Sequence, residues 1–462
     1  MILKTTLVMV LLGFIQPVFA KNPAPEWTQG AVWYYVIPER FRNINPHNDP
    51  LKLQIVGKDS KDWQVHPWAS DWYKLQIWES RRNLKFDELV GLRRYGGDLL
   101  GVLEKLYYLK DLGINVIYLT PIFESPSILK YDVSSLHHID DNLGFAHEGA
   151  WGRITPEKKK NDGEKKNSEE KVVPETEDPK TWALSKSDEV FIELLSKAHE
   201  LGMKVVITSV FHYCGRDFWA FRDVLQKQQD SDYKDWFEVV GWDDPATPDT
   251  VEFDYKSWHD DKSLPLFRQD ENGLSEPIRK YIYDSTRRWL DPNADGDPAD
   301  GVDGWAVHEA EALPEPFLTD WIKLVKSIKP NAVTLADAHS AWFANGNKFD
   351  LTMTQTFTQL LQDFFVHQKY SVSKLFEELD GLRTGSDGLA SEVHRLGDHR
   401  TDRIATIIRN SVNSDSTGVT PNNSHEYDPR KPDKQQREIQ KALTVFQLTY
   451  PGAPMILYGD ES

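Results

Sequence analysis

Two short stretches of the sequence carry side chains whose types and spacing could hold a metal ion. The run DPNADG at residues 291–296 mimics the start of a calcium-binding loop, but an EF-hand needs Glu at the twelfth position, where Val302 stands. We therefore interpret this run as a turn-rich loop. The neighbours His137 and His138 offer two imidazoles, yet zinc needs three or four ligands, and no third ligand is evident beside them. We expect no zinc site there.

The composition of the chain excludes several classes of protein. Its 462 residues suffice for two or three domains, or for one large barrel with an inserted lobe. A formal net charge of −18 provides no basic field, so we expect no nucleic-acid partner. The single cysteine, Cys214, excludes a disulfide framework and any cysteine-based zinc site. No Walker-type phosphate loop is present, and we expect no organic cofactor.

The first twenty residues have the pattern of a secretory signal. Lys4 gives a positive start, residues 7–15 form an apolar run, and residues 18–20 (VFA) place small side chains at a cleavage site. We predict cleavage after Ala20 and a periplasmic or secreted protein. No later segment reaches the roughly 20 apolar residues that cross a bilayer, so we expect no membrane partner after cleavage.

Beyond the signal, strand-like and helix-like segments alternate. Helical spacing of leucines runs over residues 99–112 and closes at Gly113, and a second amphipathic helix over residues 189–201 closes at Gly202. Continuous apolar strands separated by helices indicate a parallel sheet, and eight of them indicate a (β/α)8 TIM barrel. The eight predicted strands are residues 32–37, 115–119, 204–210, 304–307, 333–336, 351–354, 393–396 and 455–458.

Two stretches interrupt this alternation. Residues 157–171 hold lysines and acidic residues without an apolar side chain, which predicts a solvated, mobile loop. Residues 218–279 are long and aromatic, which predicts a lobe inserted after the third strand. Its tryptophans either form the core of this lobe or offer flat faces for stacking on sugars. The predicted division is a signal peptide (1–20), a first barrel part (21–211), the lobe (212–285) and a second barrel part (286–462).

Six motifs in this order resemble the α-amylase family of glycoside hydrolases, and bacterial neopullulanases and cyclomaltodextrinases in particular. The resemblance extends from about residue 30 to the last residue and implies a (β/α)8 barrel. It also implies that the chain lacks the last barrel helix and the C-terminal β-domain of the family, so we expect exposed apolar surface near Met455 and Leu457. The motifs are residues 33–41, 95–101, 117–123, 130–132, 300–305 and 450–461.

The positions at which the family carries its catalytic groups are altered. Retaining hydrolysis needs a nucleophilic carboxylate and an acid/base carboxyl about 5 Å apart. The resemblance places the nucleophile Asp at His308, the acid/base Glu at Asp337 and the third carboxylate at Arg400. Ala306 replaces the family's arginine, and Thr208 replaces the aspartate of strand three. The family's five positions sum to a negative charge, whereas these five residues are formally neutral.

A neutral site containing Arg400 would not stabilise a cationic, oxocarbenium-like transition state. Glu309 follows His308 and should point away from it, because successive strand side chains alternate faces, unless the strand end slips or bulges. Asp337 is one methylene shorter than Glu, and it either pairs with Arg400 as an ion pair or forms an acid/base pair with His308 for another reaction. We therefore predict a catalytically degenerate relative, a pseudoenzyme.

The resemblance also implies two kinds of binding site. Tyr131 and His399 fall where the family holds a sugar, by stacking and by hydrogen bonds respectively, which predicts weak α-glucan or maltooligosaccharide binding. A structural calcium site of the neopullulanase type is implied as well, weakened because one of its aspartates is Asn45 here, and the alternative is a plain Asn-rich turn. Its predicted ligands are Asn43, Asn45, Asn48, Asp49, Gly96 and Asp98.

Three functions remain open from the sequence. The favoured one is an exported, inactive relative of α-glucan-degrading enzymes that binds glucan weakly or pairs with an active paralogue. The second is an active α-glycosidase that hydrolyses α-1,4-glucosidic bonds with relocated carboxylates, at Glu309 or Asp337. The third is a truncated fragment without a function.

Overall fold

The computed structural model describes residues 24–56, 62–72, 74–84, 86–145, 175–247, 251–337, 349–384, 392–410 and 430–461. The predicted signal peptide with its cleavage site and the predicted charged loop at 157–171 lie outside these ranges. Within them, no helix is long and apolar enough to cross a membrane.

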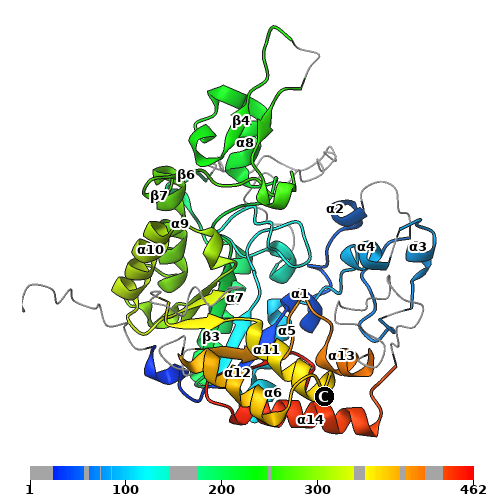
Figure 1. The fold of residues 1–462 in the computed structure, drawn as a ribbon. Helices are drawn as coiled ribbons and strands as arrows, with labels where there is room; N and C mark the ends of the chain where they lie inside the picture. Colours follow the sequence, from blue (N-terminus) through cyan, green and yellow to red (C-terminus); the bar gives the residue numbers. More distant parts are fainter. Residues whose placement is uncertain are drawn as a thin grey trace, which may run out of the picture.

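Eight parallel strands form one barrel-shaped sheet, as the sequence predicts (Figure 1). In spatial order they run β10-β9-β8-β3-β2-β1-β12-β11, so the first predicted strand pairs with the last. Between the two end strands, the described residues form a single isolated parallel bridge, from Thr352 to Glu392. The strands are β1 (Trp33–Val36), β2 (Val116–Leu119), β3 (Lys204–Ser209), β8 (Gly304–Val307), β9 (Val333–Asp337), β10 (Leu351–Met353), β11 (Val393–Arg395) and β12 (Ala453–Leu457).

Helices connect the strands. The predicted helix at 99–112 is split at Lys105 into α5 (Leu99–Glu104) and α6 (Leu106–Asp111), and Gly113 adopts the left-handed conformation that ends it. A capping box between Ser185 and Asp188 starts α7 (Lys186–Glu200). The other long helices are α9 (Glu276–Leu290), α10 (Glu315–Ile328), α12 (Val372–Thr384) and α14 (Lys434–Thr449), with the shorter α11 (Thr356–Leu361), η11 (Gln362–Val366) and α13 (Ile404–Asn410) between them.

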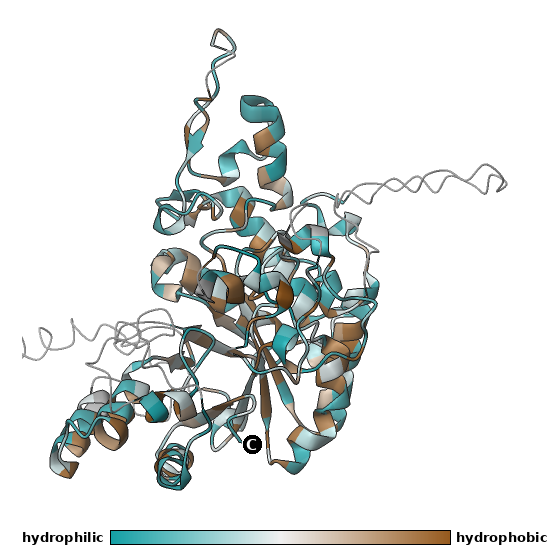
Figure 2. Ribbon diagram, turned by 90° about the vertical axis from the view of Figure 1, so that its right-hand side faces the viewer, coloured by the Kyte–Doolittle hydropathy of each residue, from teal (hydrophilic) through white to brown (hydrophobic). Residues whose placement is uncertain are grey.

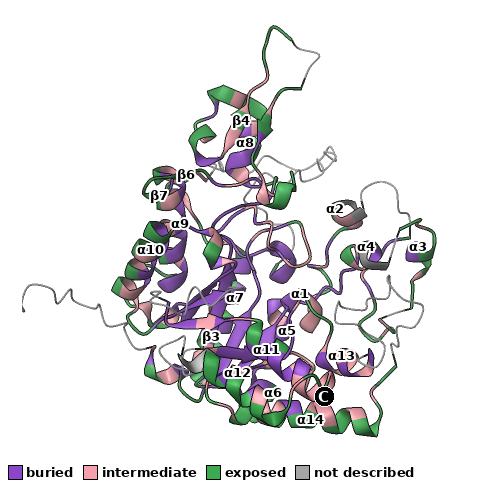
Figure 3. Ribbon diagram, in the orientation of Figure 1, coloured by how far each residue is buried: buried purple, intermediate pink, exposed green. Residues whose placement is uncertain are grey.

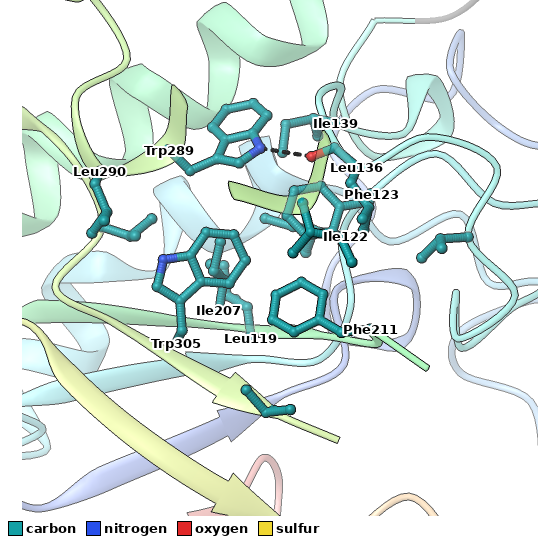
Figure 4. Packing of buried hydrophobic residues seen from close by; sticks show 14 of the residues in the cluster. Leu119, Ile122, Phe123, Leu136, Ile139, Ile207, Phe211, Trp289, Leu290 and Trp305 are labelled. Atoms are coloured by element: carbon teal, nitrogen blue, oxygen red, sulfur yellow. Dashed lines mark hydrogen bonds between the residues drawn. The ribbon is translucent and has the colours of Figure 1, made fainter. Parts of the chain in front are cut away.

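The strands are buried on both faces because one face fills the barrel and the other packs against helices. Trp33 and Tyr35 of β1 belong to the cluster inside the barrel, whereas Tyr34 and Val36 belong to the outer cluster. Figure 3 shows the barrel strands as buried, and Figure 2 shows them as hydrophobic. In the outer layer, Trp289 Nε1 donates to the Leu136 carbonyl oxygen at 3.0 Å (Figure 4).

The chain between β3 and α9 projects from one end of the barrel (Figure 1). It contains α8 (Trp219–Lys227), the pair β4 (Val239–Gly241) and β5 (Asp254–Tyr255), and the pair β6 (Gln269–Asp270) and β7 (Gly273–Leu274). Trp219 and Trp236 pack edge to face at 5.5 Å, and both contact Tyr281 of α9. These two tryptophans therefore pack in the core of this region and do not form an open surface for stacking on sugars.

The prediction of exposed apolar surface near Met455 and Leu457 is wrong. Their relative exposures are 1% and 6%, because both side chains belong to the cluster inside the barrel. The outward-facing neighbour in β12 is Ile456, which packs against the outer cluster and is only partly exposed. The alternation of side chains along the strand thus puts the two named residues on the protected face.

Candidate functional site

The residues at the predicted catalytic positions lie together at one end of the barrel. His308 directly follows β8, Asp337 is the last residue of β9, and Arg400 follows β11. Because the strands are parallel, their carboxyl ends meet at the same rim, which is where barrels of this kind place their active sites. The structure therefore brings all three predicted positions into one cluster.

Asp337 is the centre of this cluster. Its Oδ2 accepts a hydrogen bond from His308 Nδ1 at 3.3 Å, and its Oδ1 lies 3.4 Å from Arg400 Nη2. The ion pair that the sequence suggested between Asp337 and Arg400 is present. A second guanidinium, that of Arg395, lies 3.5 Å from the same Oδ1. The carboxylate is therefore enclosed by three nitrogen donors.

These neighbours determine the charge of Asp337. Burial alone would raise the pKa of this carboxyl, but the charge of Arg395, the hydrogen bond from His308 and the charge of Arg400 hold the pKa well below its ordinary range. Asp337 is therefore ionised at neutral pH. An ionised carboxylate accepts protons and cannot deliver one to a leaving group, which is the task of the family's acid/base residue.

Two members of the cluster, Arg395 and Asp398, were missed at the sequence level. Asp398 Oδ2 lies 2.9 Å from Arg400 Nη2 and 3.1 Å from Arg395 Nη2, so the two guanidinium groups share two carboxylates. Both residues are buried. The sequence did contain one signal for them. Arg395 lies inside the predicted strand 393–396, and a buried arginine requires a charged or polar partner. The network is balanced, with two positive and two negative side chains.

Glu309 does not point away from His308, because the end of the strand is irregular, which is the exception that the prediction named. Its Oε2 lies 3.8 Å from His308 Nε2 and 3.6 Å from His212 Nε2. The strand ends at Val307, and Glu309 has a φ of +44°, in the left-handed region. The alternation of faces therefore no longer applies at this position, and the turn directs the carboxylate back toward both histidines.

Tyr131 and His399, the predicted sugar contacts, also belong to this site. Their rings stack at 4.9 Å with an interplanar angle of 26°, and the Tyr131 ring lies 4.4 Å from the His308 ring. His399 Nδ1 is 2.6 Å from the hydroxyl of Tyr35. Burial, in part offset by the charge of Asp398, lowers the pKa of His399 to about 4, so its ring is neutral at neutral pH. His308 thus occupies space beside the predicted sugar-stacking ring.

The two remaining predicted positions have structural partners. Thr208 is buried in β3, and its hydroxyl donates to the Leu119 carbonyl oxygen at 2.8 Å. Ala306 is fully buried inside the barrel. Neither side chain brings a charge to the cluster.

Part of the predicted calcium site is assembled. Asn43 Nδ2 donates to Asp49 Oδ1 at 2.7 Å, and a Cβ at Gly96 would collide with both of these side chains. The side-chain oxygen of Asn48 is buried without a hydrogen-bond partner among the described residues. A buried oxygen without a partner and a position that only glycine fits are compatible with a hard cation.

The other two predicted ligands have additional roles. Asp98 caps α5, because its Oδ1 accepts from the Gly101 backbone N–H at 2.6 Å, and its Oδ2 accepts from the backbone of Ile44 and Asn45. Asn45 Oδ1 accepts from the His47 backbone at 3.2 Å. Asp98 therefore fixes the segment that carries the Asn residues, and it is already engaged by three backbone donors.

The run at 291–296 is a turn, as expected. The Asp295 backbone N–H donates to Asn293 Oδ1 at 2.8 Å, and the Gly296 backbone N–H donates to Asp291 Oδ2 at 2.9 Å. Hydrogen bonds that backbone N–H groups donate to Asn and Asp side chains a few residues earlier in the chain are typical of turns.

Comparison with known proteins gives a consistent result. The family model for the α-amylase catalytic domain matches residues 35–162 and 187–462. Cyclomaltodextrinase of Thermoanaerobacter pseudethanolicus is 28% identical over 444 residues, which cover 95% of this chain and 58% of that protein. Neopullulanase 2 of Thermoactinomyces vulgaris is 28% identical over 444 residues, covering 95% and 57%. The chain thus spans less than three fifths of the length of these relatives.

Solved structures share the fold. Cyclic α-maltosyl-(1→6)-maltose hydrolase from Arthrobacter globiformis, in complex with maltose, has a TM-score of 0.66 at 24% identity, covering 95% of this chain and 76% of that chain. An acarbose-soaked debranching enzyme from Nostoc punctiforme has a TM-score of 0.62 at 23% identity, covering 95% and 76%. The strand order, the motifs and the matched family model agree, and the chain belongs to the α-amylase catalytic-domain family.

Proposed function

We propose that this chain is a catalytically inactive member of the α-amylase family that retains weak binding of α-glucan ends. The observation that carries this proposal is the network of Asp337, Asp398, Arg395 and Arg400 at the position of the family's catalytic carboxylates. Both carboxylates are bound to guanidinium groups, and an imidazole stands at the position of the nucleophile.

This network does not suit glycoside hydrolysis. The reaction needs one protonated carboxyl group to assist departure of the leaving group and one carboxylate to attack the sugar. Asp337 is held ionised, and it is surrounded by positive charge that raises the energy of a cationic transition state. The proton donor and the stabilising negative field are therefore both missing.

Glucan binding is supported by what the site keeps. Tyr131 contacts the rings of His308 and His399, and its intermediate exposure leaves part of the side chain accessible at the barrel rim. An aromatic face can stack on the C–H groups of a pyranose, and a neutral His399 can hydrogen-bond to hydroxyl groups. The solved relatives bound to maltose or soaked in acarbose make an α-glucan the ligand class to test.

The test combines turnover and binding by the purified protein. We expect no hydrolysis of maltotriose, cyclomaltodextrin or an aryl α-glucoside, and saturable binding of maltooligosaccharide measured by calorimetry. Tyr131→Ala should abolish this binding, and Tyr107→Ala, at a residue that is 72% exposed on α6, is the matched control. Turnover that is lost in Asp337→Ala would overturn the proposal of an inactive protein. If the protein neither hydrolyses nor binds these sugars, the remaining possibilities are that it pairs with an active paralogue or that it has no function.

A second candidate, an α-glycosidase with a relocated carboxylate, is favoured by Glu309. Its carboxylate faces the site beside His308 and His212, and its side chain is 18% exposed. Hydrolysis that persists in Asp337→Ala but disappears in Glu309→Gln would support this candidate. The carboxamide keeps the shape of the side chain and removes only its charge.

We also propose a weak structural calcium site and export. Asn43, Asn48, Asp49 and the backbone near Gly96 would hold the ion, with Asp98 fixing the segment from the other side.

The proposal of export rests on the signal pattern of residues 1–20. N-terminal sequencing of secreted protein tests it, with Lys21 as the expected first residue.

A further inference from the structure

A second polar cluster lies apart from the barrel rim, around His137 and His138. The two rings lie 4.6 Å apart, centroid to centroid, in the loop that follows β2. Glu175, which is remote in sequence, lies against both: its Oε2 is 2.7 Å from His138 Nε2 and 3.4 Å from His137 Nε2. The structure thus supplies the third group that the sequence did not reveal beside the histidine pair, and the expectation of no third ligand is corrected.

The three groups converge as metal ligands do. One ligand atom from each lies within 4.8 Å of the other two, and in the described part of the chain no other group of three His, Cys, Asp or Glu residues does so. Tetrahedral zinc, with bonds of about 2.0 Å, holds its ligand atoms about 3.3 Å apart. Adjustments of less than about 1 Å would therefore place Glu175, His137 and His138 around one ion.

Each of the three groups is also fixed from behind. His138 Nδ1 is 2.7 Å from Asp188 Oδ2, and His137 Nδ1 is 2.7 Å from the hydroxyl of Tyr281. Glu175 Oε1 accepts from the Ala183 backbone N–H at 2.7 Å, which leaves Oε2 directed at the imidazoles. Metal-binding histidines and carboxylates are typically oriented by such outer hydrogen bonds.

Packing holds this arrangement rigid. Trp182 stacks on the His137 ring at 4.2 Å and 6°, and Arg288 Nη2 lies 3.1 Å from the Asp188 carboxylate. His137 and His138 are 0% and 2% exposed. Ligands that are already oriented and buried lose little freedom when an ion binds.

We propose that His137 and His138, through Nε2, and Glu175, through Oε2, form a structural zinc site. Imidazole nitrogen and carboxylate oxygen are ligands that zinc accepts in tetrahedral geometry, and three protein ligands leave one position for water. The ion would join the loop after β2 to the segment at 175–183 and, through Asp188 and Tyr281, to α7 and α9. The occupant that competes with zinc is a proton on His138, which would pair with Glu175 and Asp188 without a metal.

The experiment uses the full chain, freed of metal with a chelator, and Zn²⁺ alone as the probe. We expect one equivalent of zinc by calorimetry and elemental analysis, and X-ray absorption of the zinc-loaded protein should show imidazole scattering from two histidines. Glu175→Gln and His137→Gln should weaken zinc binding about a hundredfold or more. The matched control is His199→Gln, because His199, on α7, forms a similar pair with Asp303 at 2.7 Å without a second histidine.

Two results would overturn the proposal. One is the absence of stoichiometric zinc binding by the wild-type chain, which would leave the protonated His138 as the occupant. The other is zinc binding that is equally tight in Glu175→Gln and in the wild type, which would place the ion elsewhere. The absorption spectrum is measured on the wild type, so it decides the ligand set even if His137→Gln fails to fold.

Discussion

The guanidinium of Arg400 lies 3.4 Å from the Asp337 carboxylate, so the residues at the third-carboxylate position and at the acid/base position form an ion pair. In the parent chemistry both positions would carry carboxyl groups that face the sugar, and the acid/base group would start protonated. Here the positive and negative groups satisfy each other. The charges of this pair are therefore directed at each other within the protein.

The first prediction concerns stability. Asp337→Ala should lower the free energy of unfolding by about 3–5 kcal/mol, because it leaves the buried guanidinium of Arg395, and the more exposed one of Arg400, without this partner. Urea unfolding measures the change. The control is Asp320→Ala on α10, where the pair with Lys323 is largely exposed and should contribute less than about 0.5 kcal/mol. Equal effects of the two substitutions would contradict the role assigned to Asp337.

The second prediction concerns acid stability at Asp303. Burial opposes ionisation, but the hydrogen bond with His199 and the charge of Lys329 lower the pKa of this carboxyl to about 2. Since its folded pKa is depressed, it contributes stability above its unfolded pKa of about 3.9, and this contribution is lost as the pH falls toward 2. Asp303→Asn should remove about 2 kcal/mol at pH 7 and flatten the stability profile between pH 4 and pH 2. Parallel profiles of variant and wild type would show that the carboxylate is not responsible.

The third prediction concerns restoration of chemistry. His308→Asp alone should remain inactive, because Arg400 and the ionised Asp337 are still present. Simultaneous restoration of the family residues should give measurable hydrolysis of maltotriose, since it returns the nucleophile, the proton donor and the negative field. The combined substitutions are Thr208→Asp, Ala306→Arg, His308→Asp, Asp337→Glu and Arg400→Asp.

The control for restoration is the same combination with Asn at position 308. This variant has every change except the nucleophilic carboxylate, so it should be inactive. If the variant with all five substitutions folds but is no more active than this control, residues outside these five positions prevent hydrolysis.

The fourth prediction concerns calcium. Addition of Ca²⁺ to chelator-treated protein should raise the melting temperature, because an ion that binds only the folded state stabilises it by about 2.7 kcal/mol at a concentration one hundred times its Kd. Asp49→Asn should abolish the rise. Asp295→Asn, in the turn at 291–296, should leave it unchanged. A rise that survives in Asp49→Asn would place calcium at another site.

The barrel was predictable because its strands are continuous apolar runs. All eight predicted strands are present, and their ends differ from the predictions by at most two residues. A strand that is buried on both faces has a strong signal that does not depend on its partners. The inward direction of Met455 and Leu457 was missed because a uniformly apolar run does not show which of its faces is inside.

The details of the two polar clusters were less accessible. Glu309 turns back toward His308 because it has a positive φ, which no rule of strand alternation anticipates for a glutamate. Glu175 is separated by 37 residues from His138, and only the tertiary fold brings them together. The sequence predicted that His308, Asp337 and Arg400 lie together, whereas it did not reveal partners from distant segments.

The barrel sheet is joined least completely between β10 and β11, and the cluster around Asp337 spans this junction. Strands β10 and β11 meet through one isolated bridge among the described residues, whereas the other neighbouring strands share continuous ladders. Arg395 belongs to β11, and Asp337 belongs to β9, on the far side of β10. Their ion pair therefore connects strands on the two sides of the β10–β11 junction, where the fewest backbone hydrogen bonds join neighbouring strands. This ion pair thus links β9 to β11 across β10, and amide hydrogen exchange in β10 should become faster when Arg395 is replaced.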